Sequence, residues 1–469
     1  MEKKDLRTFL GPYRKWLIYA AITLPAGVWV YLNFVLTLVL GHPTRETREV
    51  PYAELLAQSL LAILVFMTDS RRQRLLWLAI LLPVPLWSLV RAISTDTSPA
   101  WSLALSAILL SPYIAMLLSC QVSPAIRRAL SVTFVVIVLS QFVVFPLNFL
   151  GLLADDTAAP YDRFSGTILG RGGYFSSYVV LAGAFYFGIT KARVWQKFLV
   201  FIVAFSYAWF AEVKLIFFVA GVVTASVLLF ASSAKRLFMT IPLALLAVLA
   251  GAWMSISLPS SYGLLVPQYN FSIVAPQESL DRFGSLSSVH GSKIRATISL
   301  LNPSSALWSE NGESVLVGVG PVGGLSNLSR TLDANTILAT LSRPDREFRD
   351  EARLLAGPMQ RDQSLATQPE STVNGIVSEL GYVGLFLFLG TGAAVTFLSL
   401  RRFDRAAVGV FAGFGFAFVP LFSLWEIPGF WMVLALGLAS TQQKSRVEGV
   451  PTEFKVDHPT TWKANLRLR

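Results

Sequence analysis

Long apolar runs alternate with short polar connections along most of the chain. A helix needs roughly 20 residues to cross a hydrocarbon core about 30 Å thick, and fewer where it is broken or enclosed by protein. By that measure we expect about twelve membrane helices. They cover residues 16–40, 53–68, 75–93, 101–120, 129–153, 173–190, 198–211, 214–232, 237–257, 376–400, 406–422 and 426–441.

Two closely spaced charges, Glu212 and Lys214, interrupt the apolar run from 198 to 232. A single helix there would carry both charges at its centre, where ionisable groups are costly. We therefore expect a break just before Lys214 and two short helices. The first apolar run is too long for a signal-peptide core and no small-residue cleavage site follows it, so we expect it to be retained as a span.

Composition agrees with an all-α polytopic membrane protein. Of 469 residues, 54% are hydrophobic and 14% charged, and the mean hydropathy is +0.57, which is high for a soluble domain. The single cysteine, Cys120, rules out an internal disulfide and a Cys/His metal spacing. The net charge of +11 comes without a soluble basic face, so no nucleic-acid partner is expected.

Lys and Arg concentrate in alternate short loops, which assigns those loops to the cytoplasm. Both termini then lie inside. The chain divides into a bundle of about nine helices over 1–258, a large, partly helical outer loop over 259–372, further membrane helices over 373–441, and a basic cytoplasmic tail over 442–469.

The outer loop is long enough to suggest a function of its own. Its SLDRFGSLSSVHGSKIRATISLL predicts an amphipathic helix, and TLDANTILATLSRPDREFRDEARLLAG predicts one or two more. Between them VLVGVGPVGGLS, with Gly318 and Gly320, predicts a glycine-rich turn.

Four motifs resemble, in order, those of the O-antigen ligase and O-antigen polymerase group of membrane glycosyltransferases. They are RFSGT with Arg163, AEVKLIFF with Lys214, GVGPVGG, and ESTVNGIVSELGYVGLFLF at the exit of the outer loop. The resemblance covers about residues 160–400. Ligases commonly place a histidine where this chain has Glu370, so the resemblance favours a polymerase or another exopolysaccharide enzyme.

The resemblance implies transfer of a glycan from a polyprenyl pyrophosphate donor to an acceptor hydroxyl, outside the cytoplasm and without a metal or cofactor. Negative charge grows on the departing pyrophosphate, and fixed cations would stabilise it. A carboxylate within reach of the hydroxyl would take its proton. The candidates are Arg163, Lys214, Arg171 and Arg295 for the pyrophosphate and Glu370 for the base.

Other residues near the helix start have supporting roles in this interpretation. Glu379, about two turns inside the helix, would orient Lys214 or an acceptor, or make a structural pair. Ser371 or Asn374 would cap the helix or face the site. The turn at Gly318 and Gly320 would be a backbone hinge or an anion-binding nest.

Each candidate also has a simpler interpretation. Arg163 and Arg171 would contact lipid headgroups, and Arg295 would lie on a solvated face. Glu212 would share an ion pair with Lys214. Glu370 would only complement a helix dipole, which leaves His290 as a reserve base.

Two other classes of function are open. A polysaccharide flippase would place charges and broken helices near the bilayer midplane and show repeat symmetry, whereas the outer charges gather towards one face and no clear repeat is visible. A structural scaffold would not need Lys214 at a helix break. As an enzyme, the protein would lie in the bacterial cytoplasmic membrane with its site facing outward. Its partners would be the lipid-linked donor, a glycan acceptor, membrane lipids, and a chain-length regulator or other polysaccharide-export proteins.

Overall fold

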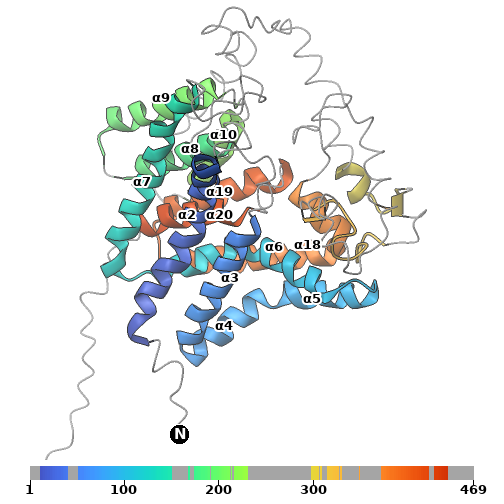
Figure 1. The fold of residues 1–469 in the computed structure, drawn as a ribbon. Helices are drawn as coiled ribbons and strands as arrows, with labels where there is room; N and C mark the ends of the chain where they lie inside the picture. The colour runs from blue at the N-terminus through green and yellow to red at the C-terminus, as the bar shows by residue number, and fades with distance from the viewer. Residues whose placement is uncertain are drawn as a thin grey trace, which may run out of the picture.

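The computed structural model describes residues 11–40, 51–149, 167–168, 174–190, 192–211, 213, 216–230, 297–305, 307–308, 314–326, 328–329, 348, 371–421 and 427–441. Within these ranges the regular structure is entirely helical, which confirms the all-α prediction for this part of the chain (Figure 1). A short 3₁₀ turn, η1 (Gly11–Tyr13), precedes the first helix. The helices are α2 (Arg14–Leu40), α3 (Pro51–Thr68), α4 (Arg71–Leu81), α5 (Pro83–Ser94), α6 (Pro99–Ser119), α7 (Pro124–Phe149), α8 (Tyr174–Gly188), α9 (Val194–Phe210), α10 (Ile216–Phe230), α18 (Thr372–Ser399), α19 (Arg405–Leu421) and α20 (Pro428–Ser440).

Helix α20 forms the centre of the bundle. Every residue from Pro428 to Ala439 is buried, and the helix packs against α2, α3, α6, α7, α8 and α19. A helix that is apolar all round belongs in a core rather than on a surface. Gly437 lets the Tyr186 ring pack directly on the α20 backbone, since a Cβ there would overlap that ring.

The outer helices carry the face that would meet lipid. Exposed large apolar side chains recur along α5 and α7 and along the second half of α18. In the described residues, four helices are long and apolar enough to cross a membrane, or five if α4 and α5 form one bent span. Shorter apolar helices make up the rest of the bundle. The protein is therefore a helical membrane protein, and the larger number of spans stays a prediction.

One predicted span is two helices rather than one. Residues 75–93 were expected as one helix, but α4 and α5 are bent by 49° at Leu82. Pro83 begins α5, where its fixed φ suits a first helical turn and its missing N–H would interrupt a continuous helix. The break expected before Lys214 is present, since α9 ends at Phe210 and α10 begins at Ile216. The span expected at 237–257 lies outside the described residues.

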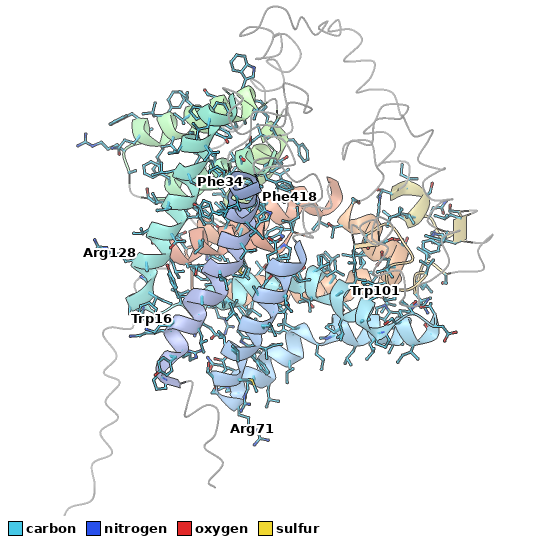
Figure 2. The ribbon with its side chains drawn as sticks, viewed as in Figure 1. Trp16, Phe34, Arg71, Trp101, Arg128 and Phe418 are labelled. Atoms are coloured by element: carbon cyan, nitrogen blue, oxygen red, sulfur yellow. The ribbon has the colours of Figure 1, made fainter. Side chains whose placement is uncertain are left out.

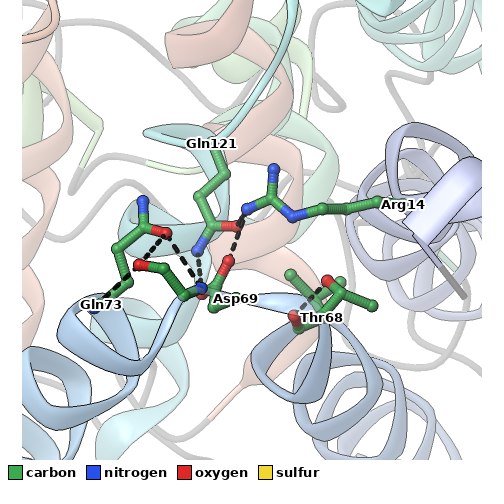
Figure 3. Close-up of polar contacts among 7 residues, drawn as sticks. Arg14, Thr68, Asp69, Gln73 and Gln121 are labelled. Atoms are coloured by element: carbon green, nitrogen blue, oxygen red, sulfur yellow. Dashed lines mark hydrogen bonds and ion pairs between the residues drawn. The ribbon is translucent and has the colours of Figure 1, made fainter. Parts of the chain in front are cut away.

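The two ends of the bundle can be told apart by their polar contacts. At the end where α2 begins, here called the N-terminal end, Arg14 pairs with Asp69 between α3 and α4 and donates to Gln121 beyond α6 (Figure 3). Arg71 and Arg128 are exposed at this end and point away from the bundle (Figure 2). At the opposite end, the loop end, described parts of the outer loop lie against α5 and α18 (Figure 1).

Candidate functional site

Most of the predicted site residues lie outside the described residues. These are Arg163, Arg171, Glu212, Lys214, His290, Arg295 and Glu370. The structure describes Gly318 and Gly320 of the glycine-rich turn, and Ser371, Asn374 and Glu379 at the start of α18. It brings these two groups together at the loop end (Figure 1).

The start of α18 is a capped helix end. Ser371 is the N-cap, and its hydroxyl accepts a hydrogen bond from the Asn374 backbone N–H at 3.2 Å. A serine in this position satisfies one of the backbone donors that a helix start leaves over. The capping role considered for Ser371 is therefore present. The Asn374 side chain instead accepts from the Thr297 hydroxyl at 2.8 Å, and so joins the helix start to the outer loop.

Helix α18 is broken at Gly381, whose φ of 67° and ψ of −169° are not helical. In a continuous helix the amides of Tyr382 and Val383 would donate to the carbonyls four residues earlier. Here they donate to the carbonyls of Val315, at 2.9 Å, and Leu316, at 3.2 Å. The amides that the break leaves without helical partners therefore need acceptors from another segment, and the glycine-rich turn supplies them.

The carbonyls just before the break find partners in the same turn and in α5. The carbonyl of Ser378 accepts from the Val319 amide at 2.8 Å, and that of Glu379 accepts from the Gly320 amide at 3.0 Å. The next carbonyl, that of Leu380, accepts from the indole N–H of Trp87 at 2.8 Å. Because buried backbone groups need partners, the turn and the helix break depend on each other.

Glycine is required where the two backbones meet. Gly318 has φ 73°, and a Cβ there would come within 2.6 Å of the Glu379 carbonyl carbon. At Gly381 a Cβ would overlap the Leu316 carbonyl. The predicted hinge is thus a rigid contact: residues 314–326, here called the glycine turn, are seated in the break of α18.

The carboxylate of Glu379 completes this contact. It is fully buried; its Oε2 accepts from the Val322 amide at 3.0 Å, and its Oε1 accepts from the Ser326 amide at 3.1 Å. The neighbouring Ser378 hydroxyl accepts from the Leu325 amide at 2.9 Å. Amides of the turn do converge on an anion, as a nest would, but the anion is this protein's own glutamate. The expected effect of Glu379 on Lys214 concerns a residue outside the described part.

Val322 shows that the turn is held under constraint. Its φ is 60°, which is unusual for a β-branched residue and costs about 1–3 kcal/mol. The hydrogen bond from its amide to Glu379 helps to hold this backbone conformation. A buried carboxylate and a strained backbone therefore support one another at the loop end.

Helix α5 supports the turn from below with residues that sequence reasoning missed. Arg91 donates through one terminal nitrogen to the Gly318 carbonyl and through the other to Ser94, at 2.8 Å. Thr95 lies so close to Gly320 that a Cβ on this glycine would overlap its hydroxyl. The available signal was an arginine near the end of a predicted span, where such residues are seldom without a role.

A second contact that sequence reasoning missed fixes the end of RFSGT. Gln141, fully buried on α7, donates to the Thr167 hydroxyl at 2.8 Å and accepts from the Thr167 amide at 3.1 Å. Arg163 itself is outside the described residues. A glutamine inside a predicted span was the signal for this contact.

A small apolar core lies above the bundle and holds the outer loop on α18. Its centre is Trp308, whose indole N–H donates to the Leu300 carbonyl at 3.2 Å and whose ring packs on Phe348 at 4.9 Å between centroids. The other members are Leu300, Leu307, Val315, Val319, Leu325 and Val377. Among the described residues, no cluster of three or more His, Cys, Asp or Glu could hold a metal ion.

No family model matches the chain, and no curated protein matches it significantly.

Proposed function

We propose that this protein is a membrane glycosyltransferase of the O-antigen polymerase type. It would add oligosaccharide units carried on polyprenyl pyrophosphate to the hydroxyl of an acceptor sugar, at the outer face of the bacterial cytoplasmic membrane. The observation that carries the proposal is the seating of the glycine turn in the break of α18. Two of the four motifs in the resemblance, more than fifty residues apart, form one buried unit.

Two further contacts support the proposal. Asn374, one helical turn beyond Glu370, is bonded to Thr297, two residues beyond Arg295. Gln141 holds Thr167, four residues beyond Arg163. Described residues two to four positions beyond Arg295, Arg163 and Glu370 are therefore hydrogen-bonded within the protein.

The proposed reaction is a direct displacement. The acceptor hydroxyl oxygen attacks the anomeric carbon of the donor, the bond from that carbon to the pyrophosphate oxygen breaks, and Glu370 takes the hydroxyl proton. Arg163 and Lys214, helped by Arg171 and Arg295, stabilise the charge that collects on the leaving pyrophosphate. In the sequence Glu370 directly precedes Ser371, the cap of α18, and the first turns of this helix are hydrogen-bonded to the glycine turn.

A reconstitution assay decides between the functions. The purified chain in vesicles, given a polyprenyl pyrophosphate oligosaccharide, should release free polyprenyl pyrophosphate and form longer glycans. Movement of the intact lipid across the bilayer without release would favour the transporter, and transfer only to a lipid or protein acceptor would favour a ligase. Either result would overturn the proposal that the protein is a polymerase.

Three substitutions test the assigned roles within that assay. Glu370→Gln should reduce single-turnover transfer by roughly 10²-fold or more, with donor binding preserved, as expected for loss of a general base. Arg163→Ala and Lys214→Ala should each nearly abolish transfer. Arg128→Ala, which removes an exposed cation at the N-terminal end, is the matched control and should transfer normally. Normal turnover in Glu370→Gln would reduce this residue to a helix-start charge and make His290 the next candidate base.

The orientation needs a separate test. We propose cytoplasmic termini and an outer loop over 259–372, because Lys and Arg favour one side at each short loop. A cysteine at Ser287, in a Cys120→Ser background, should react with an impermeant thiol reagent in intact cells. Labelling only after lysis would reverse the topology and place the proposed site on the wrong side of the membrane.

A further inference from the structure

The exposure of the α18 side chains changes at Gly381. From Thr372 to Leu380 every side chain of α18 is buried apart from the half-buried Val373. The glycine turn and the small apolar core around Trp308 enclose this part of the helix. Beyond the break, Val383, Phe386 and Leu389 are exposed at a spacing of three residues. This spacing puts them on one face of the helix. The second part of α18 therefore has a lipid-facing stripe, and the first part has none.

The length of the second part places the membrane boundary. From Tyr382 to Ser399 the helix extends about 27 Å at the usual helical rise, close to the roughly 30 Å of a hydrocarbon core. Tyrosine is common at the boundary between hydrocarbon and headgroups. This length predicts that Tyr382 lies near the depth at which one leaflet ends, and the glycine turn, which bonds the amides of Tyr382 and Val383, would lie at that depth.

Three apolar side chains of the outer loop continue this stripe. Leu316 is 57% exposed, and its carbonyl accepts from the Val383 amide. The Leu301 carbonyl accepts from the Tyr382 hydroxyl, and Ile298, one helical turn earlier and 60% exposed, shares a face with Leu301. Leu316 and Leu301 are thus hydrogen-bonded to the top of the lipid-facing stripe, and Ile298 lies on the same helical face as Leu301.

A neighbouring helix presents the same kind of surface. Leu86, Val90 and Ile93 are exposed along α5, which packs beside α18 and reaches the turn through Arg91. The exposed apolar residues of the outer loop therefore lie beside two helices that both face lipid.

We propose that the described part of the outer loop is seated in the adjoining leaflet of the bilayer, which is the outer leaflet in the proposed orientation, through Ile298, Leu301 and Leu316. The partner of this surface is the acyl-chain and headgroup boundary of the bilayer, because the surface is continuous with the lipid-facing stripes of α18 and α5. Polar Asn302 and Ser304, exposed just after the helical residues 297–301, would face water. This proposal goes beyond the proposed activity and does not depend on it.

The test measures depth in the membrane at single positions. In a Cys120→Ser background, cysteines at Leu316 and Ile298 are labelled with an environment-sensitive fluorophore, and the full chain is placed in phosphatidylcholine and phosphatidylglycerol vesicles. Phe386→Cys is the lipid-facing reference and Ser304→Cys the aqueous one. We expect both test positions to be quenched by lipids that carry a spin label near the headgroup, to at least half the extent of Phe386, and to be protected from iodide.

Two results would overturn the proposal. Iodide quenching at both test positions like that at Ser304 would place the surface in water, and lipid quenching at only one of them would show that it is not continuous. A photoactivatable phospholipid added to the unsubstituted chain provides an independent measurement, with adducts expected on peptides that contain Ile298, Leu301 and Leu316. No glycan donor is present in either experiment, so failure here leaves the proposed reaction untouched.

Discussion

A buried carboxylate lies at each end of the bundle, and the two are held in different ways. Asp69, at the N-terminal end, pairs with the Arg14 guanidinium and accepts from the Gln121 amide at 3.1 Å. The described partners of Glu379, at the loop end, are two backbone amides of the glycine turn. The first contact joins side chains of three elements, whereas the second fixes the course of a loop.

The difference decides how well each end can tolerate the loss of a hydrogen-bond or ion-pair partner. The Arg14 side chain is 32% exposed, so water can replace a lost partner there. At the loop end the donors are enclosed backbone amides, which cannot turn elsewhere or reach solvent. The N-terminal end is therefore adjustable, and the loop end is rigid and depends on a few residues.

The largest effect is expected at the helix break. Gly381→Ala should cost at least ~3 kcal/mol, because its backbone angles belong to a region that only glycine adopts readily and the new methyl group would overlap Leu316. Gly390→Ala on the same helix is the control, since nothing lies within 4 Å of its Cβ position. Yield of monodisperse protein and thermal unfolding in one detergent measure both. Similar behaviour of the two variants would contradict the seated turn.

Loss of charge should separate the two carboxylates. Glu379→Gln leaves one backbone donor facing an NH₂ group and should destabilise the protein by about 2 kcal/mol. Asp69→Asn should cost about 1 kcal/mol or less, because the Arg14 side chain that loses its charged partner is partly exposed and can be solvated, although Asp69 itself is buried. The midpoints of thermal unfolding, compared at equal protein and detergent concentrations, give the ranking. A larger loss for Asp69→Asn would reverse the comparison.

A local effect is expected at Gln141, which bonds both the hydroxyl and the backbone amide of Thr167. Gln141→Leu keeps the approximate volume on α7 but removes two hydrogen bonds to Thr167, at a cost of about 1 kcal/mol. Amide exchange at Thr167 should become several-fold faster. Gln121→Leu, at the adjustable end, serves as the comparison and should leave Thr167 exchange unchanged. Unaltered exchange in Gln141→Leu would show that other contacts fix this segment.

The sequence predicted the helices better than the site. Apolar runs are long and repeated, so their existence follows from local pattern, and the charges at Glu212 and Lys214 were enough to locate a break. The bend at Leu82 was missed although Pro83 and Pro85 stand in the run, because hydropathy alone does not register a lost N–H.

The contacts that build the loop end could not be predicted from local sequence pattern. That the amides near Gly320 would meet Glu379 depends on a pairing between segments more than fifty residues apart. The glycines were visible, but their need for a positive φ and for close approach became evident only with a partner backbone in place. Likewise the positions of Arg91 and Gln141 near or within spans indicated a role, but not which segment each would contact.

The enclosed position of α20 has a consequence for the order of assembly. This helix is the last of those described, yet it packs against helices from the beginning of the chain, such as α2 and α3. An element with no lipid-facing side gains its stability only from those neighbours. The upstream helices therefore have an incomplete core until synthesis reaches residue 440, so the centre of the bundle closes only after all the other described helices have been made.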